Sequence, residues 1–348
     1  MYNCVKLGTL TRIRTGKLDA NASSTDGAYP FFTCSREVLR IATYSYDCEC
    51  VLVAGNGDLN VKYYAGKFDA YQRTYIIESI DKSKLLAKYL YFFLDIYVEV
   101  LRTQSIGGVI KYIKLGNLAD ALIPLPGIEK QAEIVDCLET CNVIIDRIQQ
   151  QLTKLDELVK SRFVEMFGDP TLNPYGLEKK RFDTICENLD SRRRPITSSD
   201  RVAGIYPYYG ASGIVDYVED YIFDEDILLV SEDGANLLMR STAIAFSVSG
   251  KVWVNNHAHV VRFDNLATQK YIEVYFSLID ISDQITGSAQ PKLNQARLNA
   301  MEFMYPPIKR QEQFASFVAQ VDKSKLAVKQ SLEKLETLKK SLMQQYFS

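Results

Sequence analysis

Two stretches of the chain carry apolar residues at alternating steps of four and three, the spacing of a coiled-coil seam. Lys325 interrupts the second seam, and one polar seam residue often fixes register at some cost in stability. Prolines precede both stretches, and a helix-end signal, Gly168-Asp169-Pro170, follows the first. We therefore predict two long helices, each spanning roughly 55–60 Å. Their seams hold Ile134, Leu138, Cys141, Ile145, Ile148, Leu152 and Leu155 in the first helix, and Phe314, Val318, Val321, Val328, Leu332 and Leu335 in the second.

The two helical stretches are copies of each other, 180 residues apart in the chain. Residues 150–167 and 330–347 align without a gap and are identical at eight of eighteen positions. A period this long indicates a duplicated domain and not a solenoid repeat. Residues 128–178 hold five Lys/Arg against ten Asp/Glu, whereas residues 306–348 hold eight against four. Opposite net charge favours pairing of the two helices with each other. The alternative is an amphipathic helix on the surface of each domain.

The sequence between the helices predicts two globular regions of mixed α/β type. In the first, strand-like patterns cover Val5–Ile13, Cys50–Ala54 and Tyr71–Glu78, and Leu85–Leu101 has helical apolar spacing. The second region repeats this order, and its segment 286–294 matches the segment 107–114. We predict an α+β fold with an internal duplication. Its parts are a first domain over 1–127, a helix over 128–170, a second domain over 171–305 and a helix over 306–348.

Composition adds few constraints. The formal net charge is −2, which is weak evidence against a nucleic-acid partner because binding depends on local patches. Seven cysteines without a C-x-x-C pair indicate reduced thiols in the cytoplasm. The N-terminal residues do not have the pattern of a signal peptide. The most apolar run, residues 85–101, contains Lys88, Asp95 and Glu99, so we do not expect it to span a membrane.

Signals for catalysis or metal binding are weak. Leu172-Asn173-Pro174-Tyr175-Gly176 resembles the motif of amino-methyltransferases, but it lacks one proline and no glycine-rich cofactor motif accompanies it. His257 and His259 would share one side of a strand, yet no companion Cys or His cluster is present. Packing of these histidines in a core or an interface is therefore the favoured interpretation. We predict no catalytic residue and no metal site.

One family resemblance covers essentially the whole chain. The residues that carry it most specifically are Gly287-Ser288-Ala289-Gln290-Pro291-Lys292-Leu293-Asn294, followed by Pro306-Pro307 and Gln311-Glu312-Gln313. Phe167-Gly168-Asp169-Pro170 and residues 254–260 are also typical. The chain resembles the specificity subunit of a Type I restriction–modification system. The resemblance implies two target-recognition domains, each followed by a long helix, with the helices packed as an antiparallel coiled coil. The first half departs from the pattern, because residues 107–114 lack the Gln-Pro pair.

The resemblance also implies what the chain does and what it binds. It implies a non-catalytic subunit that binds a bipartite, asymmetric site on double-stranded DNA. Two methyltransferase subunits and the restriction/translocase subunits would be its partners, and S-adenosylmethionine, ATP and Mg²⁺ would belong to those partners. Three alternatives are a recognition subunit of a related system with fused nuclease–methylase chains, a stand-alone DNA methyltransferase or nuclease, and a coiled-coil scaffold without a DNA role.

Candidate DNA contacts follow from the chemistry of base and phosphate recognition. Arg and Lys read guanine, Asn and Gln read adenine, and Asp and Glu read cytosine, while cationic side chains also hold phosphates. A run of three arginines, Arg192 to Arg194, favours a nearby anion because adjacent guanidinium groups repel each other. The candidates are Arg12, Arg14, Lys17, Arg36, Asn56, Asn60, Arg73, Lys111 and Lys114 in the first domain, and Arg192, Arg193, Arg194, Asp233, Asn236, Arg240, Lys251, Asn255, Asn256, Gln290, Lys292 and Asn294 in the second.

The net charge of the second domain is unfavourable for binding DNA. Residues 179–305 carry thirteen basic against seventeen acidic residues, whereas residues 1–127 carry fifteen against twelve. The second domain must therefore segregate its charge, or depend on partner subunits for phosphate affinity.

Overall fold

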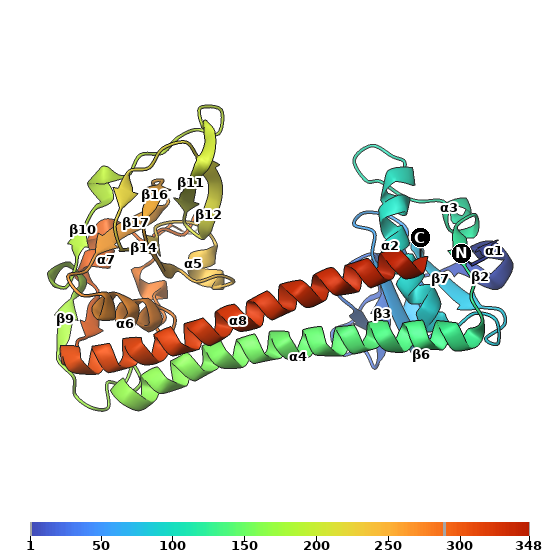
Figure 1. The fold of residues 1–348 in the computed structure, drawn as a ribbon, viewed down its shortest axis with the longest axis horizontal. Helices are drawn as coiled ribbons and strands as arrows, with labels where there is room; N and C mark the ends of the chain where they lie inside the picture. The colour runs from blue at the N-terminus through green and yellow to red at the C-terminus, as the bar shows by residue number, and fades with distance from the viewer. Residues whose placement is uncertain (1, 288–289, 348) are drawn as a thin grey trace. The chain divides into compact units, whose positions relative to one another are not determined.

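A computed structural model of the chain describes residues 2–287 and 290–347. The chain forms two compact units, which are described separately (Figure 1). Unit 1 contains residues 1–149 and 330–348, and unit 2 contains residues 150–329. The two long helices, α4 (Ile128–Phe167) and α8 (Ile308–Phe347), each contribute one part to each unit. Their starts and ends are 180 residues apart, as the duplication predicts.

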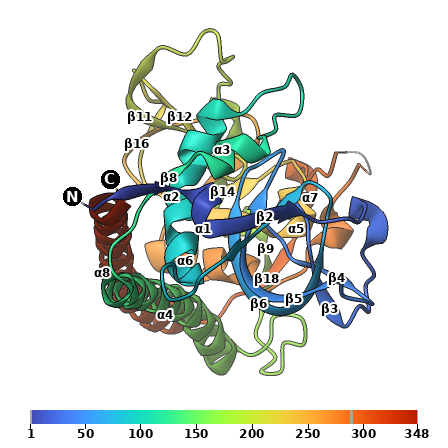
Figure 2. The same ribbon diagram turned by 90° about the vertical axis from the view of Figure 1, so that its right-hand side faces the viewer.

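Unit 1 is built on a six-stranded sheet. Its strand order is β2 (Thr11–Thr15), β7 (Thr74–Ser79), β5 (Tyr46–Ala54), β6 (Val61–Ala70), β3 (Tyr29–Phe32) and β4 (Leu39–Ile41). Neighbouring strands are antiparallel except β3 and β6, which are parallel. The long strands β5 and β6 curve along their length (Figure 2). A short 3-10 turn, η1 (Ala20–Ala22), precedes β3.

One face of this sheet packs against α2 (Ala87–Gln104). Val51, Val53 and Ile77 from the sheet share a buried core with Leu90 and Phe93 from α2. The predicted strand over residues 5–13 is wrong in detail. The chain there forms β1 (Cys4–Lys6), then a single turn α1 (Leu7–Leu10), and only then β2. The Thr11 hydroxyl donates to the Leu7 carbonyl at 2.8 Å, which stabilises that turn inside the strand-like pattern.

A two-stranded ribbon joins the globular part of unit 1 to α4. Strand β1 pairs antiparallel with β8 (Leu122–Pro124), and α3 (Leu115–Ala119) precedes β8. Unit 2 has the same device, in which β9 (Lys179–Arg181) pairs with β18 (Glu302–Met304) after α7 (Gln295–Ala300). Because β18 lies 180 residues after β8, the duplication extends from the helices into the ribbons that precede them.

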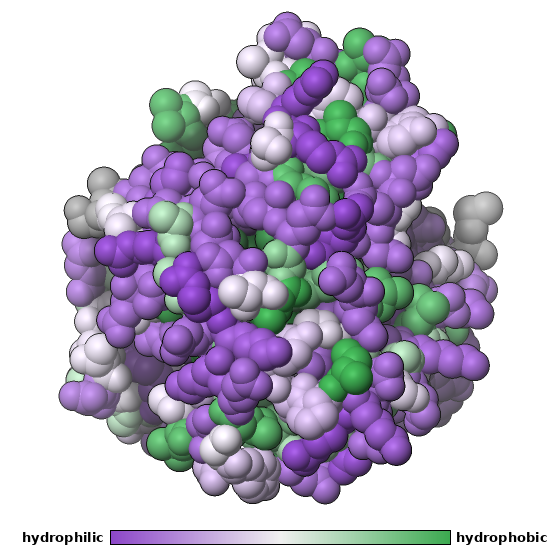
Figure 3. All heavy atoms as spheres, turned by 90° about the vertical axis from the view of Figure 1, so that its left-hand side faces the viewer, coloured by the Kyte–Doolittle hydropathy of each residue, from purple (hydrophilic) through white to green (hydrophobic). Residues whose placement is uncertain are grey.

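Unit 2 contains two four-stranded sheets. The first has the order β10 (Glu187–Asn188), β17 (Ala258–Arg262), β14 (Ile227–Ser231) and β15 (Ala245–Val248). The second has the order β12 (Gly213–Val218), β11 (Ala203–Gly210), β16 (Lys251–Val254) and β13 (Phe223–Asp224). The helices α5 (Asn236–Met239) and α6 (Leu266–Phe276) and the turns η2 (Phe182–Thr184), η3 (Asp190–Arg192) and η4 (Ser282–Gln284) complete it. The near face in Figure 3 is largely hydrophilic, with scattered hydrophobic residues.

The long helices run antiparallel within each unit. In unit 2 the Arg310 guanidinium donates to the Met166 carbonyl, and the Lys325 ammonium lies 2.5 Å from an Asp156 carboxylate oxygen. A residue with a higher number in α4 therefore contacts a residue with a lower number in α8, as in an antiparallel pair. In unit 1, Ile134 and Leu138 share a core with Met343 near the end of α8. The predicted seam positions are all buried or half-buried, and half-buried Lys325 is satisfied by Asp156.

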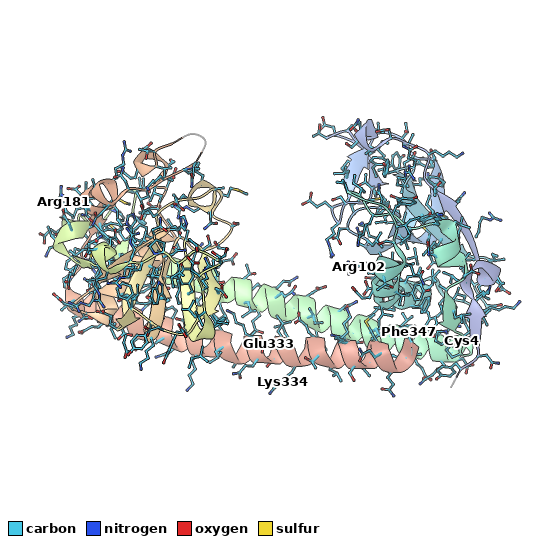
Figure 4. All side chains as sticks on the ribbon, turned by 90° about the horizontal axis from the view of Figure 1, so that it is seen from above. Cys4, Arg102, Arg181, Glu333, Lys334 and Phe347 are labelled. Carbon is cyan, nitrogen blue, oxygen red and sulfur yellow. The ribbon has the colours of Figure 1, made fainter. Side chains whose placement is uncertain are left out.

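Equivalent side chains join each globular region to the long helices. The Tyr89 hydroxyl of α2 donates to the Pro124 carbonyl at 2.8 Å, and the Tyr271 hydroxyl of α6 donates to the Met304 carbonyl at 2.9 Å. Phe347 lies at the end of α8 (Figure 4), and its ring centroid is 5.1 Å from that of Tyr89. The Phe167 ring at the end of α4 lies 4.9 Å from the Tyr271 ring. Each globular region is thus fixed to the end of a long helix by the same aromatic contact.

Buried glutamines hold the first turn of both long helices. Gln131 in α4 and Gln311 in α8 are fully buried, and their amides donate to the carbonyls of Pro126 and Pro306 at 2.9 and 2.7 Å. Gln131 also donates to the Lys84 carbonyl and accepts from a backbone amide of the segment before α2. Of the helices within residues 2–287 and 290–347, none combines the length and apolarity that crossing a membrane requires.

Candidate nucleic-acid interface

Each unit presents one loop that is closed in the same way. Loop 1 is Ile106–Tyr112 and loop 2 is Thr286–Lys292. In loop 1 the Ile106 amide donates to the Tyr112 carbonyl at 3.0 Å and the reverse bond measures 2.8 Å. In loop 2 the two equivalent bonds measure 2.8 and 2.7 Å. Ser288 and Ala289 of the predicted motif lie outside the described residues. The missing Gln-Pro pair in the first half therefore does not change how the loop is closed.

Both loops lie against the turn that follows a central strand. The Gly57 amide, just after β5, donates to the Lys111 carbonyl at 3.0 Å, and the Gly234 amide, after β14, donates to the Pro291 carbonyl at 3.0 Å. A sheet side chain then donates to the carbonyl that follows each loop. In unit 1 the Tyr75 hydroxyl lies 3.1 Å from the Ile113 carbonyl, and in unit 2 His259 Nε2 lies 2.8 Å from the Leu293 carbonyl. The loops are consequently held by rigid elements.

The glycine at the start of each loop is required by its backbone geometry. Gly107 has φ 119° and Gly287 has φ 81°, both in the left-handed region that side chains rarely adopt. A Cβ at Gly107 would lie 2.6 Å from the Ile110 carbonyl oxygen, and one at Gly287 would lie 2.5 Å from the Gln290 carbonyl oxygen. In loop 1 the tight turn therefore presents the residues after Gly107 at the loop tip.

Several predicted cationic contacts of unit 1 gather around loop 1. Lys111 belongs to the loop, Lys114 follows it, and the Arg73 carbonyl accepts a bond from Gly55 beside the Asn56 turn. Lys17 lies at the same end of the sheet, since Leu18 bridges Tyr71. These cationic side chains are exposed and form no ion pair within the described part of the chain. Arg12 is exposed as well, but it pairs in register with Glu78 at the far end of β7.

Three candidates in unit 1 instead hold the fold. Asn60 is buried and its amide donates to the carbonyls of Cys34 and Asp58 at 2.8 and 2.9 Å. The Arg36 guanidinium lies 2.8 Å from an Asp58 carboxylate oxygen. Half-buried Arg14 pairs with Glu78 at 2.7 Å and lies 4.7 Å above the Tyr46 ring. Each of the three has a contact within the chain, and their role as DNA contacts stays a prediction.

A network of charged side chains contacts loop 2. The Glu232 carboxylate lies 2.5 Å from the Arg193 guanidinium and 3.0 Å from the Lys292 ammonium of the loop. Fully buried His259 has Nδ1 2.6 Å from an Asp190 carboxylate oxygen, while its Nε2 reaches the carbonyl after the loop. The Asp190 carboxylate and the Leu293 carbonyl therefore hold the imidazole ring from both sides. Sequence reasoning had identified neither Glu232 nor Asp190.

The network lowers the pKa of both carboxyl groups. Burial by itself raises the pKa of Asp190, but the hydrogen bond and charge of His259, with the Val260 amide and Arg193, hold that pKa below its ordinary value. Burial acts on Glu232 in the same direction, and Arg193, His259 and Lys292 together hold its pKa below the ordinary value. The carboxyl groups of Asp190 and Glu232 are thus ionised at neutral pH, and the cationic side chains around them neutralise their charge.

The arginine run of unit 2 divides into two paired side chains and one free one. Arg192 pairs with Glu225 at 2.6 Å and lies 4.5 Å above the Phe223 ring. The Arg193 side chain is only 13% exposed and is surrounded by the Glu232 and Asp190 carboxylates. The expectation that an external anion stabilises the whole run is therefore corrected. Arg194 is exposed, and its guanidinium forms no hydrogen bond or ion pair with any residue that the structure describes.

Four further candidates in unit 2 have structural roles. The Arg240 guanidinium donates at 3.0 Å to the carbonyl of Phe276, the last residue of α6, and at 3.0 Å to the Ile279 carbonyl. Asn236 binds the Ser241–Thr242 segment, and Asn294 accepts from the Arg297 amide as the N-cap of α7. Asn255 is buried and accepts from the His257 amide at 2.8 Å. These side chains are bonded within the chain, and their role in contacting DNA stays a prediction.

The remaining candidates of unit 2 lie next to loop 2, with one exception. Gln290 is exposed at the loop, and Asp233 bridges Lys292 through the backbone. Exposed Asn256 precedes His257, whose Nδ1 lies 2.9 Å from an Asp233 carboxylate oxygen. The exception is Lys251, whose ammonium lies 4.6 Å from the Tyr221 ring centroid on the second sheet. His257 is thus exposed beside loop 2. From the sequence, packing in a core or an interface was the favoured interpretation for this histidine.

The segment that resembles a methyltransferase motif is a turn. The Asn173 amide donates to the Leu177 carbonyl at 2.9 Å, and its side-chain oxygen accepts from the Leu177 amide at 2.9 Å. Asn173 has φ 45°, which asparagine tolerates better than most residues. The polar atoms that a catalytic asparagine would offer to a substrate are therefore engaged in the turn after α4.

Each unit also has a groove between its globular region and the long helices. In unit 2 it has a volume of about 960 Å³ and is lined by residues of α6 and both long helices, among them Asp156, Lys160 and Asp322. In unit 1 it has a volume of about 610 Å³ and includes Asn142, Glu336 and Lys340. These residue numbers differ by 180, so the two grooves are equivalent by the internal duplication.

The paired and the free arginine predict opposite effects. Replacing Arg193 by alanine takes one cationic partner away from each of the Asp190 and Glu232 carboxylates, and we expect the free energy of unfolding to fall by about 3–5 kcal/mol. Replacing Arg194 by alanine should change that free energy by less than about 0.5 kcal/mol. In the assembled complex, however, it should reduce the slope of log affinity for DNA against log salt by about one. Denaturation curves and a salt titration measure these effects, and equal stabilities of the two variants would contradict this assignment.

Comparisons with known proteins identify the family. The sequence matches the family described as "Type I restriction modification DNA specificity domain" over residues 2–157 and 174–338. It is 38% identical over 159 residues to the Type I restriction enzyme EcoDI specificity subunit of Escherichia coli, which covers 46% of this chain and 35% of that protein. It is 32% identical over 152 residues to a putative Type I specificity subunit of Haemophilus influenzae, covering 44% and 39%. These alignments span little more than a third of the relatives' lengths.

Solved structures share the fold over nearly the whole chain. The S subunit of a Type I restriction–modification system from M. genitalium aligns with a TM-score of 0.62 at 16% identity, covering 100% of this chain and 96% of that chain. A chain from a study of complex assembly in the Type I system aligns with a TM-score of 0.53 at 13% identity, covering 99% and 97%. The family match extends over both halves of the sequence, and the chain belongs to the family of Type I restriction modification DNA specificity domains.

Proposed function

We propose that this chain is the DNA-reading subunit of a Type I restriction–modification complex, and that each unit reads one half of a bipartite target. The observation that carries the proposal is the pair of loops, which share one backbone framework but present different side chains. Loop 1 exposes Val109, Ile110 and Lys111, whereas loop 2 exposes Gln290 beside Lys292. A common frame with divergent tips suits a protein that reads two different short sequences.

Free cations around loop 1, and a free arginine in unit 2, supply a means of holding the DNA backbone. Arg73, Lys111 and Lys114 serve in unit 1, and Arg194 serves in unit 2. Such contacts position the protein on the duplex without reading the sequence. Unit 2 neutralises many of its charges internally, so its affinity for phosphate depends more on partner subunits than that of unit 1 does.

The chain itself takes no catalytic part in this proposal. Methyl transfer and DNA cleavage belong to partner subunits, which bind S-adenosylmethionine, ATP and Mg²⁺. The equivalent grooves of the two units support docking of two copies of one partner, because a duplicated frame offers the same surface twice. Two methyltransferase subunits are the proposed occupants, and the restriction/translocase subunits join that core.

Mapping methylated adenines in a host that carries this chain with its partner genes tests the proposal. We expect two short fixed blocks separated by unspecified bases, with different sequences in the two blocks because the loop tips differ. A single continuous motif, or a perfect palindrome, would contradict a reader with two diverged halves. A host without any methylation that depends on this chain would contradict the role in DNA recognition altogether.

A further inference from the structure

Loop 1 has an apolar tip that its own unit leaves uncovered. Val109 is 104% exposed and Ile110 is 62% exposed, although both are aliphatic. The segment between α2 and α3 that contains them extends past the end of α2 (Figure 1). Single exposed apolar residues are ordinary on protein surfaces, but two adjacent ones on a rigidly closed loop form a contact surface.

The surroundings of this tip are cationic. No acidic residue occurs between Glu99 and Asp120, whereas Arg102, Lys111 and Lys114 fall within that stretch. Arg102 is neutralised by Asp58 and Glu99. Lys111 and Lys114 are exposed and have no ion pair in the part of the chain that the structure describes. An apolar tip with a cationic rim is complementary to an anionic partner that also has an apolar surface.

A DNA major groove has this combination of chemistry. Phosphates line its edges, and the C5 methyl group of thymine is the apolar feature on its floor. The position of loop 1 in the duplicated frame favours DNA over other anionic partners. Loop 2 stands at the equivalent position, and its exposed residue Gln290 has the amide group that reads adenine.

We propose that Val109 and Ile110 read thymine in the first half of the target by contact with its C5 methyl group, while Lys111 and Lys114 hold the adjacent phosphates. The proposal rests on the DNA-reading function proposed above and names its specificity-determining residues. Aliphatic side chains form no directional hydrogen bond with bases. Discrimination by this loop therefore depends on the methyl group, which uracil lacks.

Replacing thymine by uracil in the first block tests this directly. Binding of the assembled complex to its mapped target is compared with binding to duplexes in which each thymine in turn is changed to uracil. We expect affinity about 3- to 5-fold weaker for each contacted methyl group, the effect of removing one buried apolar carbon. Replacing thymine by uracil in the second block should leave the contribution of loop 1 to the affinity for DNA unchanged.

A variant that removes the aliphatic tip identifies the residues responsible. In Val109→Ser with Ile110→Ser, the penalty for uracil in the first block should disappear, while any penalty in the second block stays as in the unchanged protein. Gln290→Ala is the matched control, and it should keep the penalty in the first block. Because both replaced side chains in loop 1 are exposed, the thermal midpoint of the variant should match that of the unchanged chain.

Several outcomes would overturn the inference. A first block without thymine, or one in which uracil is tolerated at every position, excludes methyl recognition by loop 1. If the double-serine variant loses the same amount of affinity for every sequence and keeps the uracil penalty, loop 1 contacts DNA without reading its sequence. If the variant keeps DNA recognition but loses binding to vesicles of anionic lipid, the tip serves a membrane surface. Failure of the proposed function differs from all of these, because the unchanged complex would then prefer no sequence.

Discussion

Replacing Phe163 by alanine is expected to lower the free energy of unfolding of unit 2 by about 3–5 kcal/mol, the usual cost of removing a fully buried aromatic side chain. Phe163 is 0% exposed in α4. Its ring centroid lies 5.1 Å from those of Phe167 and Tyr271, and 5.5 Å from that of Phe314. These rings belong to α4, α6 and α8, so one substitution loosens all three helices.

Two matched variants separate packing from other effects of the substitution. Val164 is the next residue and is 40% exposed, so Val164→Ala should cost less than about 0.5 kcal/mol. Phe163→Met introduces the residue found at the equivalent position in the other copy, Met343, which is buried in unit 1. We expect this variant to cost less than Phe163→Ala, because methionine fills irregular gaps. Denaturant titration gives the values, and a loss below about 1 kcal/mol for Phe163→Ala would show that the aromatic cluster does not hold the helices.

The same cluster explains why the duplicated frame is stable while the surfaces diverge. Phe167 and Phe347 contact Tyr271 and Tyr89, which in turn bind the ribbon strands β18 and β8. None of these rings and carbonyls belongs to loop 1 or loop 2, so a change within the loops removes none of these contacts. The residues that fix each globular region to the long helices are thus different from the residues of loops 1 and 2.

The long helices and the duplication could be predicted from the sequence because the signal is local and periodic. A side chain such as Leu138 or Val318 lies at a seam position whatever the rest of the chain does, since the helical repeat places it there. The strand over residues 5–13 failed for the opposite reason. Its apolar and polar residues fit a strand, but the bond from Thr11 to the Leu7 carbonyl favours a turn between β1 and β2.

The reading surface could be predicted only in part, because pairing between distant residues decides which charges are free. Nothing near Arg193 in the sequence indicates that Glu232, 39 residues later, neutralises it. Asn60 resembles a base-reading amide, yet it is bonded to the carbonyls of Cys34 and Asp58. Conversely, Val109 and Ile110 carry no charge and were not among the candidates. Their signal in the sequence was an aliphatic pair between two glycines and a lysine.

The duplicated arrangement of ribbons and helices predicts which DNA target a chain with two identical globular regions would recognise. Residues 7–121 of unit 1 and residues 182–301 of unit 2 lie between equivalent ribbon strands, β1 and β8 in one case and β9 and β18 in the other. The first segment can therefore replace the second at matching junctions. The changes Phe163→Met, Phe314→Ile and Val318→Leu would give the receiving helices the side chains that pack at the equivalent positions of unit 1, Met343, Ile134 and Leu138.

Mapping the methylated target of this duplicated chain, assembled with its partner subunits, tests most directly the claim that each unit reads one half of the site. Because both units would then carry the same loop on the same duplicated frame, both halves of the target should have the same sequence. The predicted target contains the first block twice, and the second block of the unchanged protein no longer occurs in it. A target that keeps the original asymmetric pair of blocks would contradict the claim.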